Sequence, residues 1–408
     1  MMPELAEAGR SQTGKSGLRG AMLSLVSRIL GCLGRFWVRN GAVLGALTLW
    51  AFIVAILAFG WLRPIHTWDM VAYLASAWDG RYGSPAELHT RVWNAIRQGV
   101  DPAHFSTLAM GDAYRERQFT DPAAFRSMLG MYEVKWLYVQ ILGLIEPIFG
   151  AVRAGFVINI GAAIGFATVL TWWLRAIGNL YLAPLVVGLL MVAGFPELAL
   201  AETPDLLTLV LVLSGFLLLE REKRLTGSTF LLLAVLVRPD SAAVCGVLMA
   251  MAWLWRDSRS LLLAAVFALS VGAYVFVSKQ GHHPGWWPHL WFSTYQMQDT
   301  MEGFAPAFSI KVYAVAFVWN LVRSASENSW LGLYMLALGG WAVAHTAGLR
   351  LNSRDVVLVA ATFIALAAKY VLFPLHDGRT YLPLLLPGIL ILVNGLWRQG
   401  VPRGAHQN

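Results

Sequence analysis

The chain has 408 residues, of which 57% are hydrophobic and 13% are charged, and its formal net charge is +8. Soluble domains carry about 25% charged residues. Half that fraction, together with many long apolar runs, excludes a soluble globular protein and indicates an integral membrane protein. The runs are continuous and do not alternate, which favours spanning helices over a barrel. The basic residues gather between these runs, so membrane topology explains the positive charge and we predict no nucleic-acid partner.

Short motifs exclude several further site classes. The two cysteines, Cys32 and Cys245, each lie in or next to an apolar stretch, which excludes a disulfide framework and a cysteine metal site. Gly14-Lys15-Ser16 lacks the upstream glycine of a P-loop, and there is no CxxC or HExxH motif. We therefore predict no metal ligands and no cofactor; a divalent cation is compatible with the pattern but not indicated by it.

The N-terminal segment, residues 1–40, is basic and is expected to be cytoplasmic. Residues 1–20 are polar and rich in Gly and Ser, which predicts disorder. Residues 21–38 alternate apolar and basic residues at helical spacing, so we expect them to lie along the membrane surface. Some forty residues before the first apolar run are too many for a secretory signal peptide, so the first span is expected to be retained.

The first span is predicted at 42–62, where about 21 residues would rise about 31 Å as a helix and match the hydrocarbon core. The chain then emerges into a long polar segment, residues 63–131. Pro85, Asp101-Pro102 and Asp121-Pro122 are each typical of helix starts, with Ser or Asp as the cap. We predict two or three short juxtamembrane helices on the outer surface in a first periplasmic loop, and no independent domain.

Further apolar runs follow at 132–149, 154–174, 180–194, 206–219, 228–255, 260–278, 309–322, 330–347, 356–373 and 380–397. The basic segments between them favour the cytoplasm, as does the tail at 398–408. All these basic segments can lie on the cytoplasmic side only if some apolar runs do not cross the membrane. We therefore expect 132–149 to enter the membrane without crossing it, and 309–322 to be re-entrant or surface-bound. The run 228–255 would be two short helices broken at Arg238-Pro239-Asp240. Alternatively, 132–149 crosses and the positive-inside rule fails once.

The predicted fold is therefore all-α: a polytopic transmembrane bundle of about 9–11 spans over residues 41–397, with both termini cytoplasmic. Four polar clusters then share the outer side, at 69–80, 197–205, 281–288 and 376–379. Arg238 and Asp240 point to the same side from within the membrane. A charge deep in a bilayer costs several kcal/mol, so such residues usually line a cavity or pathway.

Asp69 is the first candidate for a catalytic general base. Shielding by Trp68 and Tyr73 would raise the pKa of its carboxyl group towards a useful value. The alternative is a helix cap or a solvated loop residue. Asp79, which Gly80 follows, is the second catalytic candidate, and its alternative is a simple turn.

Other candidates would bind substrate. Glu202 or Asp205 could position an acceptor hydroxyl, or could merely cap the next helix. Arg238 and Arg379 could each hold a phosphate by a two-pronged contact. Their alternatives are an ion pair between Arg238 and Asp240, and an ordinary turn whose arginine reaches lipid headgroups.

The loop at 281–289 carries three histidines and a tryptophan pair. His282 and His283 are adjacent, which is poor geometry for metal ligands, and no nearby carboxylate completes a site. Trp286 and Trp287 are suited to anchoring at the interface or stacking on a sugar ring.

The order of these features resembles the GT-C superfamily of polytopic glycosyltransferases, as a short bacterial-type member. The resemblance covers about residues 40 to 397. It rests on an acidic residue in the first outer loop, a long loop with juxtamembrane helices, an acidic helix start, a broken helix, and an Arg- and Tyr-containing run before a late span. The residues that carry it are Asp69, Tyr73, Pro204-Asp205, Arg238-Pro239-Asp240 and Arg379 to Pro383.

The resemblance implies transfer of a sugar from a polyprenyl-phosphate donor to an acceptor hydroxyl, with inversion, for cell-envelope glycan, glycolipid or glycoprotein synthesis. Asp69 would deprotonate the acceptor, and Arg238, Arg379 or Lys135 would stabilise the departing phosphate. The implied partners are the donor, a glycan, lipid or protein acceptor, and membrane lipid. The implied location is the bacterial inner membrane with a periplasmic site. The full set of expected substrate-binding residues is Tyr73, Lys135, Glu202, Asp205, Arg238, His282, Trp286, Arg379 and Tyr381.

Two other functions fit a membrane bundle with internal charges. A transporter or flippase for a lipid-linked sugar would also line a path with charge, but the chain shows no paired half-repeats. A membrane acyltransferase usually offers a histidine-centred site, for which His282 and His283 are the candidates.

Overall fold

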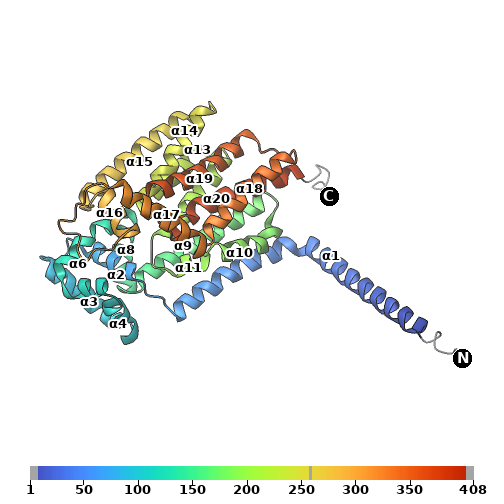
Figure 1. Cartoon of the computed structure of the whole chain (residues 1–408), viewed down its shortest axis with the longest axis horizontal. Helices are drawn as coiled ribbons and strands as arrows, with labels where there is room; N and C mark the ends of the chain where they lie inside the picture. Colours follow the sequence, from blue (N-terminus) through green and yellow to red (C-terminus); the bar gives the residue numbers. More distant parts are fainter. Residues whose placement is uncertain (1–7, 257–259, 401–408) are drawn as a thin grey trace.

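The computed structural model describes residues 8–256 and 260–400. Within these residues it contains twenty α-helices and three short 3-10 helices, without a β-strand (Figure 1). The predicted all-α fold is confirmed. Five helical segments are long and apolar enough to cross a membrane: Arg39–Leu62 of α1, α9 (Ala154–Ala176), α15 (Ser260–Gln280), α19 (Ser353–Leu372) and α20 (Leu382–Gly400). The chain is therefore a membrane protein.

Helix α1 runs without a break from Ala8 to Leu62, over 55 residues, and its N-terminal part projects away from the body (Figure 1). The predicted disorder is wrong from Ala8 onward, and residues 21–38 form no separate helix; residues 1–7 lie outside the described residues. No proline interrupts this stretch. Each residue added to an existing helix gains one hydrogen bond, so the helix of the span propagates backward through the polar segment.

The polar segment that follows folds into six short helices, not two or three. We call residues 63–135 the head. Its predicted helix starts at Pro85, Pro102 and Pro122 are confirmed, each preceded by a capping Ser or Asp whose side chain accepts backbone N–H groups. Asp112 caps a further helix that the sequence analysis did not recognise. The helices are α2 (Trp68–Trp78), α3 (Pro85–Gly99), α4 (Pro102–Met110), α5 (Ala113–Thr120), α6 (Pro122–Met128) and α7 (Gly130–Glu133).

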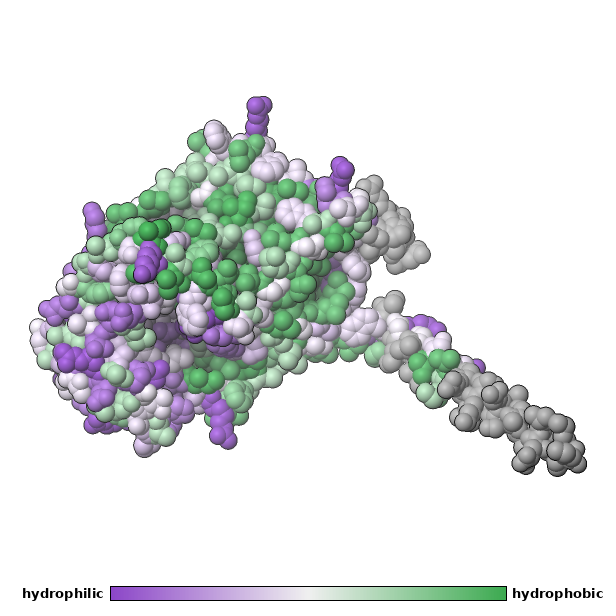
Figure 2. Space-filling model, in the orientation of Figure 1, coloured by the Kyte–Doolittle hydropathy of each residue, from purple (hydrophilic) through white to green (hydrophobic). Residues whose placement is uncertain are grey.

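The head has a hydrophobic core in which Leu74, Val92 and Phe125 are fully buried, and Met301 from a later loop completes it. Hydrophilic residues gather over the head at the lower left of Figure 2, whereas the surface of the bundle is largely hydrophobic. This contrast matches a bundle surrounded by lipid and a head in water.

The bundle contains, in addition, α8 (Trp136–Phe149), η1 (Leu180–Leu182), α10 (Ala183–Val192), α11 (Phe195–Leu200), α12 (Asp205–Glu220), α13 (Arg224–Val237), η2 (Pro239–Ser241), α14 (Ala242–Leu254), α16 (Trp286–Thr294), α17 (Ile310–Ser326), α18 (Trp330–Thr346) and η3 (Gly378–Thr380). The predicted break of the run 228–255 at Arg238 is confirmed. Whether α8 and α17 cross the membrane stays a prediction.

Helices α12 and α13 pack very closely at two glycines. A Cβ on Gly227 would lie 2.9 Å from the carbonyl oxygen of Gly215, so only glycine allows this approach. Helix α12 also packs against α9 and α20, and it belongs to both large hydrophobic clusters of the bundle. This central helix begins at Asp205, and its position fixes where that carboxylate stands.

Candidate functional site

The site is centred on an ion pair between the head and the bundle. Asp69 lies in the first turn of α2, and Arg379 lies in η3. The Nη2 of Arg379 donates to Asp69 Oδ2 at 3.0 Å, and the hydroxyl of Tyr132 donates to Asp69 Oδ1 at 3.3 Å. The side chains of Asp69 and Arg379 are each about a quarter exposed. The pair is therefore within reach of a molecule arriving from outside.

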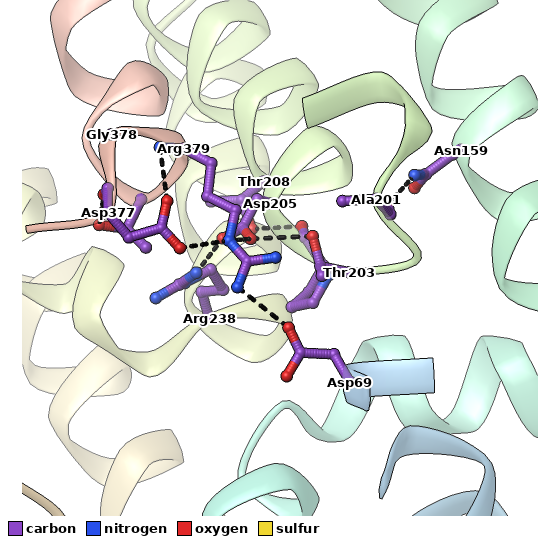
Figure 3. A network of polar contacts seen from close by, with 12 residues as sticks. Asp69, Asn159, Ala201, Thr203, Asp205, Thr208, Arg238, Asp377, Gly378 and Arg379 are labelled. Carbon is purple, nitrogen blue, oxygen red and sulfur yellow. Dashed lines mark hydrogen bonds and ion pairs between the residues drawn. The ribbon is translucent and has the colours of Figure 1, made fainter. Parts of the chain in front are cut away.

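Arg379 also connects two further carboxylates. Its Nε donates to Asp377 Oδ2 at 2.6 Å and lies 3.7 Å from Asp205 Oδ2. The hydroxyl of Thr203 donates to that same oxygen of Asp205 at 2.9 Å. Figure 3 shows Asp69, Asp205 and Asp377 arranged around the guanidinium group of Arg379. Three carboxylates from distant segments thus share one cation.

Arg238 provides the second cation of this network. Its Nη1 contacts Asp205 Oδ1, and its Nε and Nη2 donate to Asp240 at 3.2 and 3.1 Å. The Nζ of Lys369, near the end of α19, lies 2.8 Å from Asp240. Arg238 has an extended backbone because Pro239 cannot continue α13, and this break leaves its side chain directed at the carboxylates.

Lys135 is a further cation close to these ion pairs. Among the described residues no carboxylate oxygen lies within 4.0 Å of its Nζ, which donates instead to the carbonyl oxygen of Met131. Burial and the nearby charge of Arg238 lower the pKa of Lys135 to about 8. We call Asp69, Asp205, Arg238, Asp240, Lys369, Asp377 and Arg379 the ion-pair network, and Lys135 lies beside it.

The predicted convergence of the outer clusters is therefore observed for the segments around residues 69, 205, 238 and 379. Tyr73 follows Asp69 by one helical turn and is buried, with its ring packed edge-on against Tyr132 and Tyr138. Glu202 is buried just outside the network, and its Oε1 lies 3.6 Å from His66 Nδ1.

Two predicted residues are placed elsewhere. Asp79 caps the far end of α2, about 15 Å along the helix axis from Asp69, and pairs with Arg126 at 3.0 Å. The hydroxyl of Tyr381 donates to the carbonyl oxygen of Leu375, and its ring stacks on Trp330 with centroids 4.1 Å apart. Tyr381 therefore supports the loop that carries Arg379.

The histidine loop carries two of the predicted binding residues, His282 and Trp286, and both are exposed. Trp286 is 43% exposed and donates to the carbonyl oxygen of Leu372. The ring of His289 bonds to that of His283 at 2.9 Å. Burial and the charge of Lys135 lower the pKa of both, that of His283 to about 4. The loop therefore presents a neutral histidine pair near Lys135.

Sequence reasoning missed three residues that the structure brings to the site. Lys369 is the lone lysine of an apolar span. Because a charged side chain within a membrane is energetically costly, its position in the sequence could have identified it as a candidate site residue. Tyr132 and His66 carried no such signal, because tyrosine and histidine are common at membrane interfaces.

The fold and the site together define an all-α membrane protein with a charged network between its bundle and its head. Comparison of the chain with protein-family models, with curated proteins and with solved structures returns no match.

Proposed function

We propose that the chain is a membrane glycosyltransferase that moves a sugar from a polyprenyl-phosphate donor to an acceptor hydroxyl. The observation that carries this proposal is Lys135, which has no carboxylate partner among the described residues and lies close to Arg238 and Arg379, at the junction of the head and α8. A lipid phosphate has its charge at such a boundary and its tail among apolar helices.

Arg379 and Lys135 would hold the donor phosphate. As the bond between the anomeric carbon and the phosphate oxygen breaks, negative charge grows on that oxygen. Cations fixed before the reaction stabilise this charge without reorganisation. The acceptor oxygen would attack from the opposite face of the sugar, which inverts the anomeric configuration.

Asp69 would act on this donor site through Arg379. In the free protein the ion-pair network, together with Lys135, holds four carboxylates and four cations, so its charges balance. A bound phosphate would compete with Asp69 for the Arg379 guanidinium group. Binding would therefore exchange one anion for another at that cation, and the Asp69 carboxylate would lose its ion pair.

The basic residues at the opposite end of the bundle support the proposed orientation. They include Arg175, Lys223, Arg224, Arg354 and Arg398, close to the ends of α9, α12, α19 and α20. By the positive-inside rule this end is cytoplasmic. The head and the site then face the periplasm of a bacterial inner membrane, where acceptors for the cell envelope are available.

The second candidate function is a flippase for a lipid-linked sugar. The observation that favours it is the interruption of α13 and α14 by η2, which carries Asp240 into the bundle beside Arg238 and Lys369. Interrupted helices with charged residues are typical of transporters.

The test uses purified protein in detergent with a panel of radiolabelled polyprenyl-phosphate sugars and candidate acceptors, and it measures release of lipid phosphate. The matched variants are Lys135→Met at the site and Lys279→Met at the exposed end of α15. We expect wild type and Lys279→Met to turn over the donor, and Lys135→Met to lose about 10²- to 10³-fold. Equal turnover by all three would show that Lys135 does not serve the reaction.

If the wild-type protein shows no turnover in this assay, it is reconstituted into liposomes that contain the same lipid-linked sugars. Movement of the sugar between leaflets, without release of lipid phosphate, would support the flippase function and contradict the glycosyltransferase function.

A further inference from the structure

A second polar centre lies beside the ion-pair network and forms no part of it. His66 comes from the loop after α1, Glu202 from the loop before α12, and Tyr138 from α8. The side chains of His66 and Glu202 are 6% and 3% exposed, and Tyr138 is fully buried. We call these three residues the His66 centre.

The His66 centre contains buried polar atoms that lack partners. His66 Nδ1, Glu202 Oε2 and the Tyr138 hydroxyl make no hydrogen bond within the described residues. Leaving such a group unsatisfied costs about 1–3 kcal/mol. Three of them side by side are unusual in a region that serves packing alone, and they indicate a place for a polar ligand.

Glycine on the neighbouring helix lets α9 pack closely against this centre. A Cβ on Gly155 of α9 would lie 3.2 Å from the Cβ of Glu202 and 3.5 Å from the Tyr138 hydroxyl. The contact with Glu202 would be tight, so a larger side chain at 155 would press on the Glu202 side chain. Gly155 therefore helps to fix where the polar groups of the centre stand.

The His66 centre adjoins the donor site through both of its loops. His66 precedes Asp69 by three residues, and Glu202 precedes Asp205 by three. Asp69 and Asp205 are themselves joined through Arg379. The two loops therefore bring His66 and Glu202 into contact next to the ion-pair network.

A line of ionisable groups connects this centre with the surface of the head. The ring of His66 lies edge-on to that of His104, with centroids 5.8 Å apart. His104 pairs with Asp101, and both of these side chains are about half exposed. Exposure therefore rises stepwise from Glu202 through His66 to His104.

We propose that Glu202 takes the proton of the acceptor hydroxyl, and that His66 and His104 pass this proton to the solvent. The inference rests on the proposed glycosyltransferase function and names the carboxylate that accepts the proton of its acceptor. In the step, the acceptor oxygen forms a bond to the anomeric carbon and gives its proton to the carboxylate. The bond from that carbon to the phosphate oxygen breaks, and the lipid phosphate leaves with the electron pair.

The other carboxylates near the site are engaged. Both oxygens of Asp69 accept hydrogen bonds, from Tyr132 and Arg379. Asp205 is bound by Arg238 and by the Thr203 hydroxyl. Asp69 stays a candidate for the same proton, since donor binding would free one of its oxygens, and the experiment below separates the two carboxylates.

The surroundings of Glu202 keep its carboxylate basic. Burial raises the pKa of Glu202, and the opposing influence comes from His66. From α8 it faces the uncharged Tyr138, and α9 contributes Gly155 and Asn159, neither of which is ionisable. Because the pKa of Glu202 is raised, turnover should fall as the pH drops through that value.

The experiment measures the pH profile of lipid phosphate release for wild type, Glu202→Gln, Glu202→Asp and Asp69→Asn, with thermal melting to confirm folding. We expect Glu202→Gln to lose about 10²- to 10⁴-fold in kcat together with the acidic limb of the profile. Glu202→Asp should restore part of the rate and the limb. Asp69→Asn should keep the limb at a lower rate. A limb that persists in Glu202→Gln and disappears in Asp69→Asn overturns the proposal.

A second readout is independent of turnover, so that the two proposals can fail separately. Dicyclohexylcarbodiimide modifies protonated carboxyl groups in apolar surroundings, and peptide mass spectrometry locates the adduct. We expect modification of Glu202 that persists to higher pH in His66→Gln, because His66 favours the charged carboxylate. If no donor is turned over, this result still supports the His66 centre while the glycosyltransferase proposal fails. A Glu202 that resists modification, or is insensitive to His66, overturns the centre itself.

Discussion

Replacing Lys135 by methionine should make the protein more stable while removing its proposed activity. Burial and the charge of Arg238 lower the pKa of Lys135 from 10.5 to about 8. Each pKa unit corresponds to 1.36 kcal/mol, so the charged side chain destabilises the folded state by up to about 3 kcal/mol at neutral pH. Methionine fills a similar volume without charge. We expect a gain of about 1–3 kcal/mol for Lys135→Met at pH 7.

The pH dependence of this gain follows from the direction of the pKa change. Below about pH 8, Lys135 is charged in both the folded and the unfolded chain, and the destabilisation is complete. Between about 8 and 10.5 the folded protein releases the proton while the unfolded chain keeps it, so wild-type stability rises relative to the variant. The advantage of Lys135→Met should therefore shrink over this interval and disappear above it.

The assay is thermal melting in detergent across this pH range, with wild type, Lys135→Met and Lys135→Arg side by side. Lys135→Arg keeps its charge throughout and should show no gain at neutral pH. Other lysines titrate equally in all three proteins, so the difference isolates position 135. A Lys135→Met protein that is less stable than wild type at pH 7, or whose advantage does not change with pH, would refute the reasoning.

Three further outcomes are expected. Asp69→Asn and Arg379→Gln should show a coupling energy of about 0.5–3 kcal/mol in a double-mutant cycle, towards the low end because both side chains are partly exposed; additive effects would contradict the pairing. Gly45→Ala should lower the melting temperature, because its Cβ would collide with a backbone carbonyl of η1, whereas Gly34→Ala, with open space around it, should not. Tyr381→Phe should cost about 1 kcal/mol in unfolding free energy by losing its hydrogen bond to the carbonyl oxygen of Leu375.

The sequence predicted the elements whose signals are local. Ser84, Asp101 and Asp121 each cap a helix that begins at a proline, and Pro239 ends α13 where the pattern required a break. The apolar runs became helices because nothing else satisfies their backbone groups in lipid. The stretch from Ala8 onward was predicted to be disordered because of its polar composition. It contains no residue that ends a helix, and α1 extends through it.

The site was predictable only in part, because topology indicates which residues lie at one end of the bundle but not which of them are in contact. Topology placed Asp69, Arg238 and Arg379 at one end of the bundle, and the structure joins them. Topology could not tell Asp69 from Asp79, because their difference lies in which end of an 11-residue helix meets the bundle. Likewise, the lower exposure of His289 compared with His282 depends on the course of a turn through Gly285, at φ 100°. Such choices are made by tertiary packing and leave no local pattern.

The Asp69–Arg379 pair has a consequence for how the protein is made. The two residues are separated by 310 positions along the chain. At a synthesis rate of about 5–20 residues per second, Asp69 waits about 15–60 s before its cation is translated. Arg238 and Asp205 find each other much earlier, since their helices are consecutive. During this interval the nascent protein lacks Arg379, so Asp69 is without the cation with which it pairs in the complete fold.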